Sequence, residues 1–200
     1  KNADIDLRGS LAQPSSWDGT IKANVQNVRQ GDFGLDDVKL DVVADHGKAT
    51  VREARVDAGT NHIVLRGSVD LPQTAEGFGR TPGNFQISID APDLKQLTGF
   101  LTPPATGALQ ANGTLTTNDG VVNLDLKATG DLIGYGEAAV KNLTANISAK
   151  RKMPPVEQKD APFFAGLSSS VHTELHDVRY GDYAVDQVSA DVKSDGAKAA

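Results

Sequence analysis

The chain has 200 residues, a formal net charge of −6 and no cysteine. Without cysteine it can form neither a disulfide framework nor a thiol nucleophile, and its dispersed charge lacks the clustered basic face that nucleic acids require. It contains no apolar run of about 18 residues, the length that predicts a membrane-spanning helix, and no signal peptide. Because its first residue is Lys1, we expect the chain to be a piece of a longer protein.

Alternation of apolar and polar residues dominates from the N-terminus onwards. In chain order it covers residues 5–11, 21–25, 38–42, 63–71, 85–89, 109–115, 122–126, 143–147 and 171–175. A period of two predicts strands of an antiparallel sheet with one apolar face and one polar face. Tips such as Asn118-Asp119-Gly120 supply the positive φ angles that tight hairpins need, so we expect sequential strands to pair.

Two kinds of interruption break this period. Apolar residues three apart, from Leu94 through Leu97 to Phe100, predict one short helix near residues 93–101. Prolines and dense charge in residues 151–162 indicate a linker or loop, and residues 72–82 indicate a second excursion. We therefore divide the chain into a repetitive β segment (1–150), the proline-rich linker (151–162) and a further β segment (163–200). The insertions are expected to leave the sheet at its edges without ending it.

The chain repeats itself. Residues 31–42 match residues 181–192 without a gap, and residues 136–147 fit the same template. In each copy a glycine and an acid come first, and then the apolar spacing widens from two to three, as from Val185 to Val188. One extra residue predicts a bulge or bent corner that resets which residues face inward. Leu-Arg-Gly-Ser recurs at 7–10 and 65–68, where glycine within a strand predicts a bend or a close backbone approach.

These units, Gly-Asp-Phe or Gly-Asp-Tyr followed by alternating apolar residues and Leu-Arg-Gly-Ser, resemble the repeats of AsmA-like and TamB-like bacterial envelope proteins. The resemblance covers nearly the whole chain, and the TamB (translocation and assembly module) branch is favoured. It implies an all-β fold: an elongated, curled, mostly antiparallel sheet that forms an open groove with an apolar concave face.

The resemblance also implies a function. Such a segment would lie in the periplasm, in a parent protein anchored in the inner membrane. It would serve lipid transport and outer-membrane biogenesis by shielding acyl chains or nascent outer-membrane β segments between the two membranes. Its partners would be phospholipid or outer-membrane protein segments, with an outer-membrane assembly partner bound through regions outside this chain.

No residue pattern indicates catalysis. His172, Glu174 and His176 share one face of a predicted strand, but same-face neighbours on a strand lie roughly 7 Å apart, which is wide for three zinc ligands. The acids at 32, 36 and 37 lack the alternating ligands of a calcium loop and fit turn chemistry better. The chain has neither a nucleophile elbow nor a phosphate-binding loop. We therefore predict that it is not an enzyme and has no catalytic residue, no cofactor and no metal.

The apolar stripe has two interpretations, a groove wall or the core of a closed sandwich. The scarcity of bulk, with six Phe, three Tyr and one Trp, favours the groove. The alternative function is an extracellular β-sandwich adhesin or binding module, although a sugar-binding module would normally show a row of exposed aromatics that this sequence lacks. Trp17 could anchor a groove edge or simply cover the end of the sheet. The predicted groove-lining residues are Ile21, Val25, Leu40, Ile63, Leu65, Ile87, Leu124 and Ile147.

Overall fold

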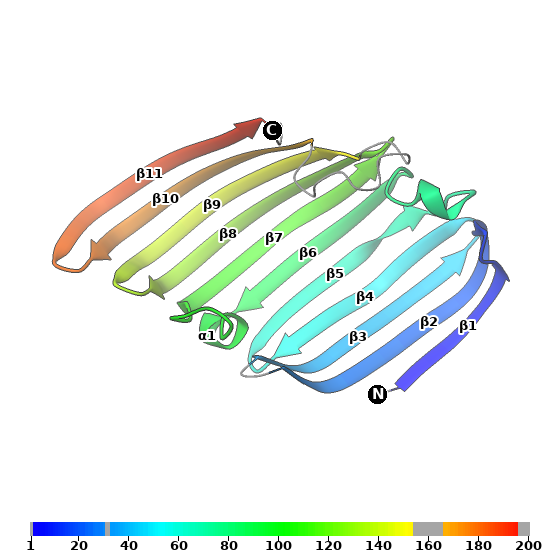
Figure 1. Cartoon of the computed structure of the whole chain (residues 1–200), viewed down its shortest axis with the longest axis horizontal. Coiled ribbons are helices and arrows are strands. Elements are labelled where there is room, and N and C mark those ends of the chain that lie inside the picture. The colour runs from blue at the N-terminus through cyan, green and yellow to red at the C-terminus, as the bar shows by residue number, and fades with distance from the viewer. Residues whose placement is uncertain (1, 31–32, 154–165, 196–200) are drawn as a thin grey trace.

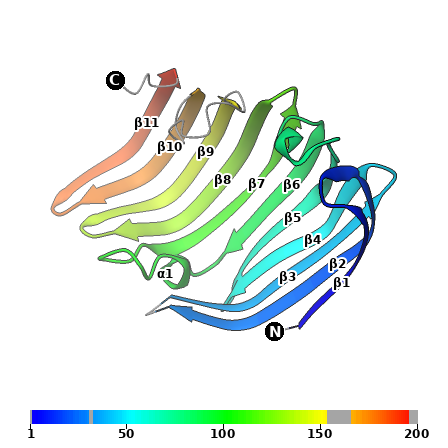
Figure 2. The ribbon, with the colours of Figure 1, turned by 45° about the vertical axis from the view of Figure 1, so that its right-hand side comes forward.

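A single antiparallel sheet makes up most of the described part of the chain. The computed structural model describes residues 2–30, 33–153 and 166–195. Its eleven strands lie in sequence order from β1 to β11, and each pairs antiparallel with its neighbours in the chain (Figure 1). The sheet is open and curled, and its strands bend along their length (Figure 2). The predicted all-β fold class is confirmed. No helix in the described residues is long and apolar enough to span a membrane.

The elements follow one another with short turns and two longer insertions. They are β1 (Asn2–Ser10), β2 (Gln13–Gln30), β3 (Phe33–Asp45), β4 (Lys48–Ala58), β5 (Asn61–Asp70), η1 (Ala75–Gly77), β6 (Gly83–Ala91), α1 (Leu94–Leu97), β7 (Thr106–Asn118), β8 (Val121–Tyr135), β9 (Ala138–Lys152), β10 (Leu167–Tyr180) and β11 (Tyr183–Asp195).

The register places most of the apolar residues of the eleven strands on one side, which we call the apolar face. Directly paired residues point to the same side of a sheet, so a chain of pairs defines a row across it. The central row contains only aliphatic residues and one glycine. Its members, from β1 to β11, are Ala3, Ala23, Leu40, Ala54, Leu65, Ile87, Gly113, Leu126, Ile147, Val171 and Val192.

Each of the three repeats belongs to a hairpin, and the three hairpins bend at the same position. They form β2–β3, β8–β9 and β10–β11, and in each the pairing skips one residue on both strands. In the last hairpin, for example, His176 pairs with Gln187 and the next pair is Val178 with Val185. The skipped residue of the first strand has a positive φ angle in every copy: 55° at Asn27, 52° at Leu132 and 52° at Asp177. The predicted reset of the inward-facing residues is confirmed, and it involves both strands because they must bend together to remain hydrogen-bonded.

The glycine of each Leu-Arg-Gly-Ser unit meets a neighbouring backbone. Gly9 and Gly67 have φ angles of 126° and 156°, which residues with a side chain rarely adopt. A Cβ at Gly67 would overlap the carbonyl oxygen of Asn84 on β6. The close backbone approach predicted for this glycine is therefore confirmed.

The first insertion, residues 71–82, borders one end of the strands. The backbone N–H of Leu71 donates to the carbonyl oxygen of Gly47 (2.7 Å), and that of Ser15 donates to Pro72 (2.9 Å). The ring of Trp17 lies 6.0 Å from that of Phe78 between centroids. Trp17 thus packs against the insertion at this end of the apolar face, and β5 still pairs directly with β6.

The second insertion, residues 92–105, borders the opposite end. Its predicted helix near residues 93–101 is shorter than expected, a single turn, α1, which ends at Leu97, two residues before Gly99. Buried Asn61 connects it to the sheet by accepting from the backbone N–H of Asp93 (3.0 Å) and donating to the carbonyl oxygen of Ala58 (2.9 Å). Both insertions leave the sheet uninterrupted, as expected.

The predicted linker lies mostly outside the described residues. Arg151 and Lys152, assigned to it from sequence, belong to β9, while residues 154–162 are among those the structure does not describe. Beyond it, β10 pairs with β9, and β11 pairs with β10. The segment after the linker therefore continues the same sheet.

Candidate functional site: an open apolar face

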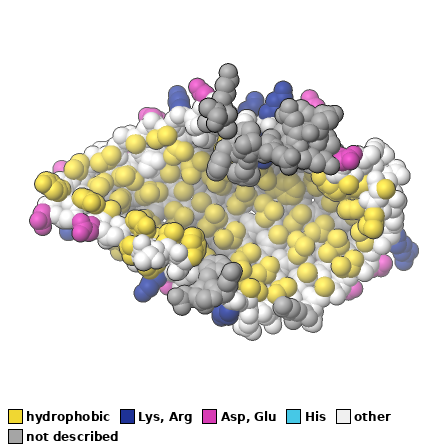
Figure 3. Space-filling view, viewed as in Figure 1, with side chains coloured by type: hydrophobic (Ala, Val, Ile, Leu, Met, Phe, Trp, Pro, Cys, Tyr) yellow, Lys and Arg dark blue, Asp and Glu magenta, His cyan; other side chains and the backbone are white. Residues whose placement is uncertain are grey.

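The side chains of the apolar face are crowded but not covered. In β6, half-buried Phe85, Ile87 and Ile89 alternate with exposed polar residues on the other side. Side chains converge on the hollowed side of a curved sheet and diverge on its outer side, which explains the difference in exposure. Apolar side chains spread over this face from end to end, and the face is hollowed along its middle (Figure 3).

The described residues build almost no conventional core. The buried hydrophobic residues that form this core are Leu71 and five alanines, Ala44, Ala58, Ala91, Ala111 and Ala145, and Pro14 is fully buried as well. A packed domain normally buries a sheet face against a second layer, and the described residues provide no second sheet. The closed sandwich considered from sequence is therefore not the architecture of this part of the chain. An exposed apolar surface that extends over many strands is typical of an interaction site.

All eight predicted groove-lining residues lie on this face. Leu40, Leu65, Ile87 and Ile147 belong to the central row. Ile21 and Leu124 belong to the adjoining row that contains Phe85, and Val25 and Ile63 belong to the row on the other side. The structure adds residues that the prediction omitted although the same periodicity contains them: Phe85, Leu115, Leu126 and Val171.

The polar face carries ion pairs. Asp57 lies 2.8 Å from Arg55 Nε and 2.6 Å from His62 Nδ1. Burial raises the pKa of Asp57, but hydrogen bonds from Arg55 and His62 outweigh it, and the pKa of this carboxyl lies below its usual value. This cluster is a structural ion-pair network between β4 and β5.

The three residues considered as zinc ligands do not converge on one point, because His172 and His176 contact different partners. His172 Nδ1 lies 3.0 Å from Asp191 Oδ1, and its Nε2 lies 3.6 Å from Glu174 Oε1. The hydrogen bond to Asp191 raises the pKa of His172, with a smaller contribution from Glu174. His176 instead pairs with Gln187 across the strands. The described residues contain no group of three His, Asp or Glu side chains placed to hold a metal ion.

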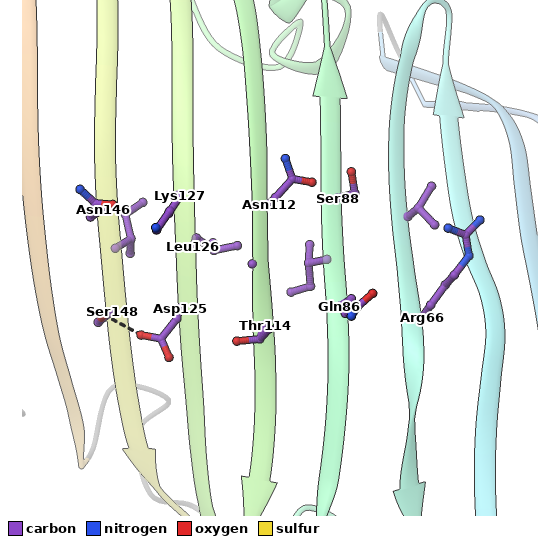
Figure 4. Close-up of a pocket in the computed structure, with 14 residues that line it drawn as sticks. Arg66, Gln86, Ser88, Asn112, Thr114, Asp125, Leu126, Lys127, Asn146 and Ser148 are labelled. Atoms are coloured by element: carbon purple, nitrogen blue, oxygen red, sulfur yellow. Dashed lines mark hydrogen bonds between the residues drawn. The ribbon is translucent and has the colours of Figure 1, made fainter.

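A shallow hollow crosses several strands, and both polar side chains and the central-row residues Ile87, Leu126 and Ile147 line it (Figure 4). Strands β5 to β9 line it with amide, hydroxyl and charged groups. Arg66 and Lys127 project from two of these strands, and the Ser148 hydroxyl donates to Asp125 Oδ1 (2.7 Å). The exposed polar groups around the hollow face water.

No family model, curated protein or solved structure matches the chain. Its function has to be argued from the apolar face itself.

Proposed function

We propose that this chain is a non-catalytic segment of an AsmA/TamB-like periplasmic protein whose parent is anchored in the inner membrane. Its apolar face shields lipid acyl chains, or nascent outer-membrane β segments, on their way between the two membranes. One observation carries the proposal: an aliphatic row runs across all eleven strands on a face that the described residues leave uncovered.

The hydrophobic effect supplies the affinity. Each methylene group removed from water contributes about 0.8 kcal/mol, so roughly ten buried methylenes of an acyl chain contribute about 8 kcal/mol before ordering costs. Covering half-exposed Leu65 and Ile87 adds to this gain. No covalent step is involved.

Continuity of the rows supports movement along the groove. The central row contains no charged residue from Ala3 to Val192. A chain that moves from strand to strand along this row therefore meets a nearly uniform aliphatic wall. Uniform contacts mean that no single position traps the cargo.

Site-specific photo-crosslinking tests the proposal in cells that express the parent protein. A photoreactive amino acid at position 87 faces the groove, and one at position 86 faces the outer surface of the same strand. We expect phospholipid or an outer-membrane β segment to be captured at 87 and not at 86, with mass spectrometry to identify the adduct. Equal capture at both positions, or capture at 86 alone, would contradict the proposal.

A further inference from the structure

All three tyrosines of the chain lie in one row. They are Tyr135 at the end of β8, Tyr180 at the end of β10 and Tyr183 at the start of β11. Ala138 of β9 pairs with both Tyr135 and Tyr180, and Tyr180 pairs with Tyr183. Their exposures are 51%, 62% and 79%, which leaves the rings open to solvent.

This row forms the outer border of the apolar face. Two positions further in lies a parallel row of Ile133, Val140, Val178 and Val185, so the tyrosines point to the same side as the groove wall. The two hairpin tips that carry them lie next to each other at one end of the strands (Figure 1). We call Tyr135, Tyr180 and Tyr183 the tyrosine rim.

Carboxylates flank the rim. The backbone N–H of Gly181 donates to the carbonyl oxygen of Glu137 (3.3 Å), which joins the two tips. A Cβ built at Gly181 would lie 4.0 Å from Glu137 Oε2, so this carboxylate reaches the neighbouring turn. Asp182 stands between Tyr180 and Tyr183 in the sequence. Within the described part of the chain, no ion pair involves Glu137 or Asp182.

Aromatic faces beside carboxylates suit one class of ligand, a quaternary or primary ammonium ion. The quadrupole of each ring attracts the cation, and an unpaired carboxylate adds a charge of opposite sign. Along the strands, polarity changes from aliphatic residues to phenol rings to acidic turns. This order matches an amphiphile whose tail lies inside and whose headgroup lies at the border, as interfacial tyrosines do at a membrane surface.

We propose that the tyrosine rim binds the ammonium headgroup of a zwitterionic phospholipid whose acyl chains lie on the apolar face. This inference rests on the proposed function, because the headgroup reaches the rim only if the groove holds the tails. It favours lipid over an extended β segment as cargo, since a polypeptide strand has no such polar end.

Competition between two lipids tests the rim separately from the groove. Protein with the photoreactive residue at position 87 is mixed with vesicles of equal phosphatidylcholine and phosphatidylglycerol with identical acyl chains. The captured ratio reports headgroup preference, because the tails contribute equally. We expect wild-type protein to enrich phosphatidylcholine.

Three variants test whether the tyrosine rings cause that headgroup preference. Tyr→Leu at all three rim positions keeps apolar area but removes the rings, and we expect the ratio to fall by about two- to five-fold for each ring in contact with the cation. Tyr→Phe at the same positions keeps the rings and should keep the preference. Phe78→Leu, an aromatic change at the opposite end of the strands, is the matched control and should leave the ratio unchanged.

The possible negative results distinguish the rim proposal from the groove proposal. Capture at position 87 without headgroup preference, or a preference that survives Tyr→Leu, overturns the rim and leaves the groove standing. Absence of any lipid adduct overturns the rim together with lipid as the cargo of the groove. A photoreactive residue at position 183 that captures a protein, and not phospholipid, would identify the rim as a protein interface and refute this assignment.

Discussion

Replacing Gly67 by alanine should destabilise the sheet far more than the same change at another glycine with positive φ. The φ angle of 156° at Gly67 lies in a region essentially restricted to glycine, which costs about 1–3 kcal/mol for other residues. The new Cβ would also overlap the carbonyl oxygen of Asn84, with the Phe85 Cα 2.6 Å away. Separating β5 from β6 to relieve this overlap adds about 1–3 kcal/mol. We expect a total loss of about 2–6 kcal/mol.

Gly136→Ala is the matched control. Its φ angle is 59°, and a Cβ there meets nothing within 4 Å, so only the backbone cost of about 1–2 kcal/mol applies. Urea unfolding followed by circular dichroism gives both midpoints, and the m-values should stay equal to that of wild type. Equal losses for the two variants would refute the inference that the strand backbones touch at Gly67.

Three further outcomes follow from the site. Ile87→Lys places a charge in the middle of the groove and should reduce lipid capture by a photoreactive residue at the paired position 65 at least ten-fold, whereas Gln86→Lys should leave that capture unchanged. Asp191→Asn should lower the pKa of His172 towards its ordinary value in an NMR titration. In wild type the His172–Asp191 contribution to stability is complete below pH 6.5 and is lost as pH rises through the raised pKa of His172. If the His172 pKa in the Asp191→Asn variant equalled that of wild type, the pairing would be contradicted. Asn61→Ala removes three hydrogen bonds from a residue that is 1% exposed and should cost about 1–3 kcal/mol in urea unfolding. A loss below the error of the measurement would show that α1 docks without Asn61.

Much of the fold could be predicted because its signals are local. Alternation identified the strands, and the hairpin turns specified a meander, since a chain with short turns can only pair neighbours. The repeat located the corner at Leu35, Val140 and Val185. Each corner also needs a residue with a positive φ angle on the preceding strand. This residue could not be inferred, because Asn27, Leu132 and Asp177 share no residue type.

The tyrosine rim was missed for a different reason. Tyr135 and Tyr180 are 45 positions apart, and only the pairing of β8, β9 and β10 brings them into one row. A row of exposed aromatics is therefore not evident in the sequence, although the structure contains one. A signal existed, since a Tyr-Gly-acid triplet begins at both positions. The curvature of the apolar face likewise results from bends in many strands together, so no single segment of the sequence indicates it.

Water accessibility along β6 tests the central claim, that lipid lies against one side of this sheet, most directly. The chain has no cysteine, so single cysteines from position 84 to 90 can each carry a spin label. We expect added phospholipid to shield the labels at 85, 87 and 89 from a water-soluble relaxation agent while those at 84, 86, 88 and 90 stay accessible. Shielding with no such alternation, or no change at the odd positions, would contradict the account.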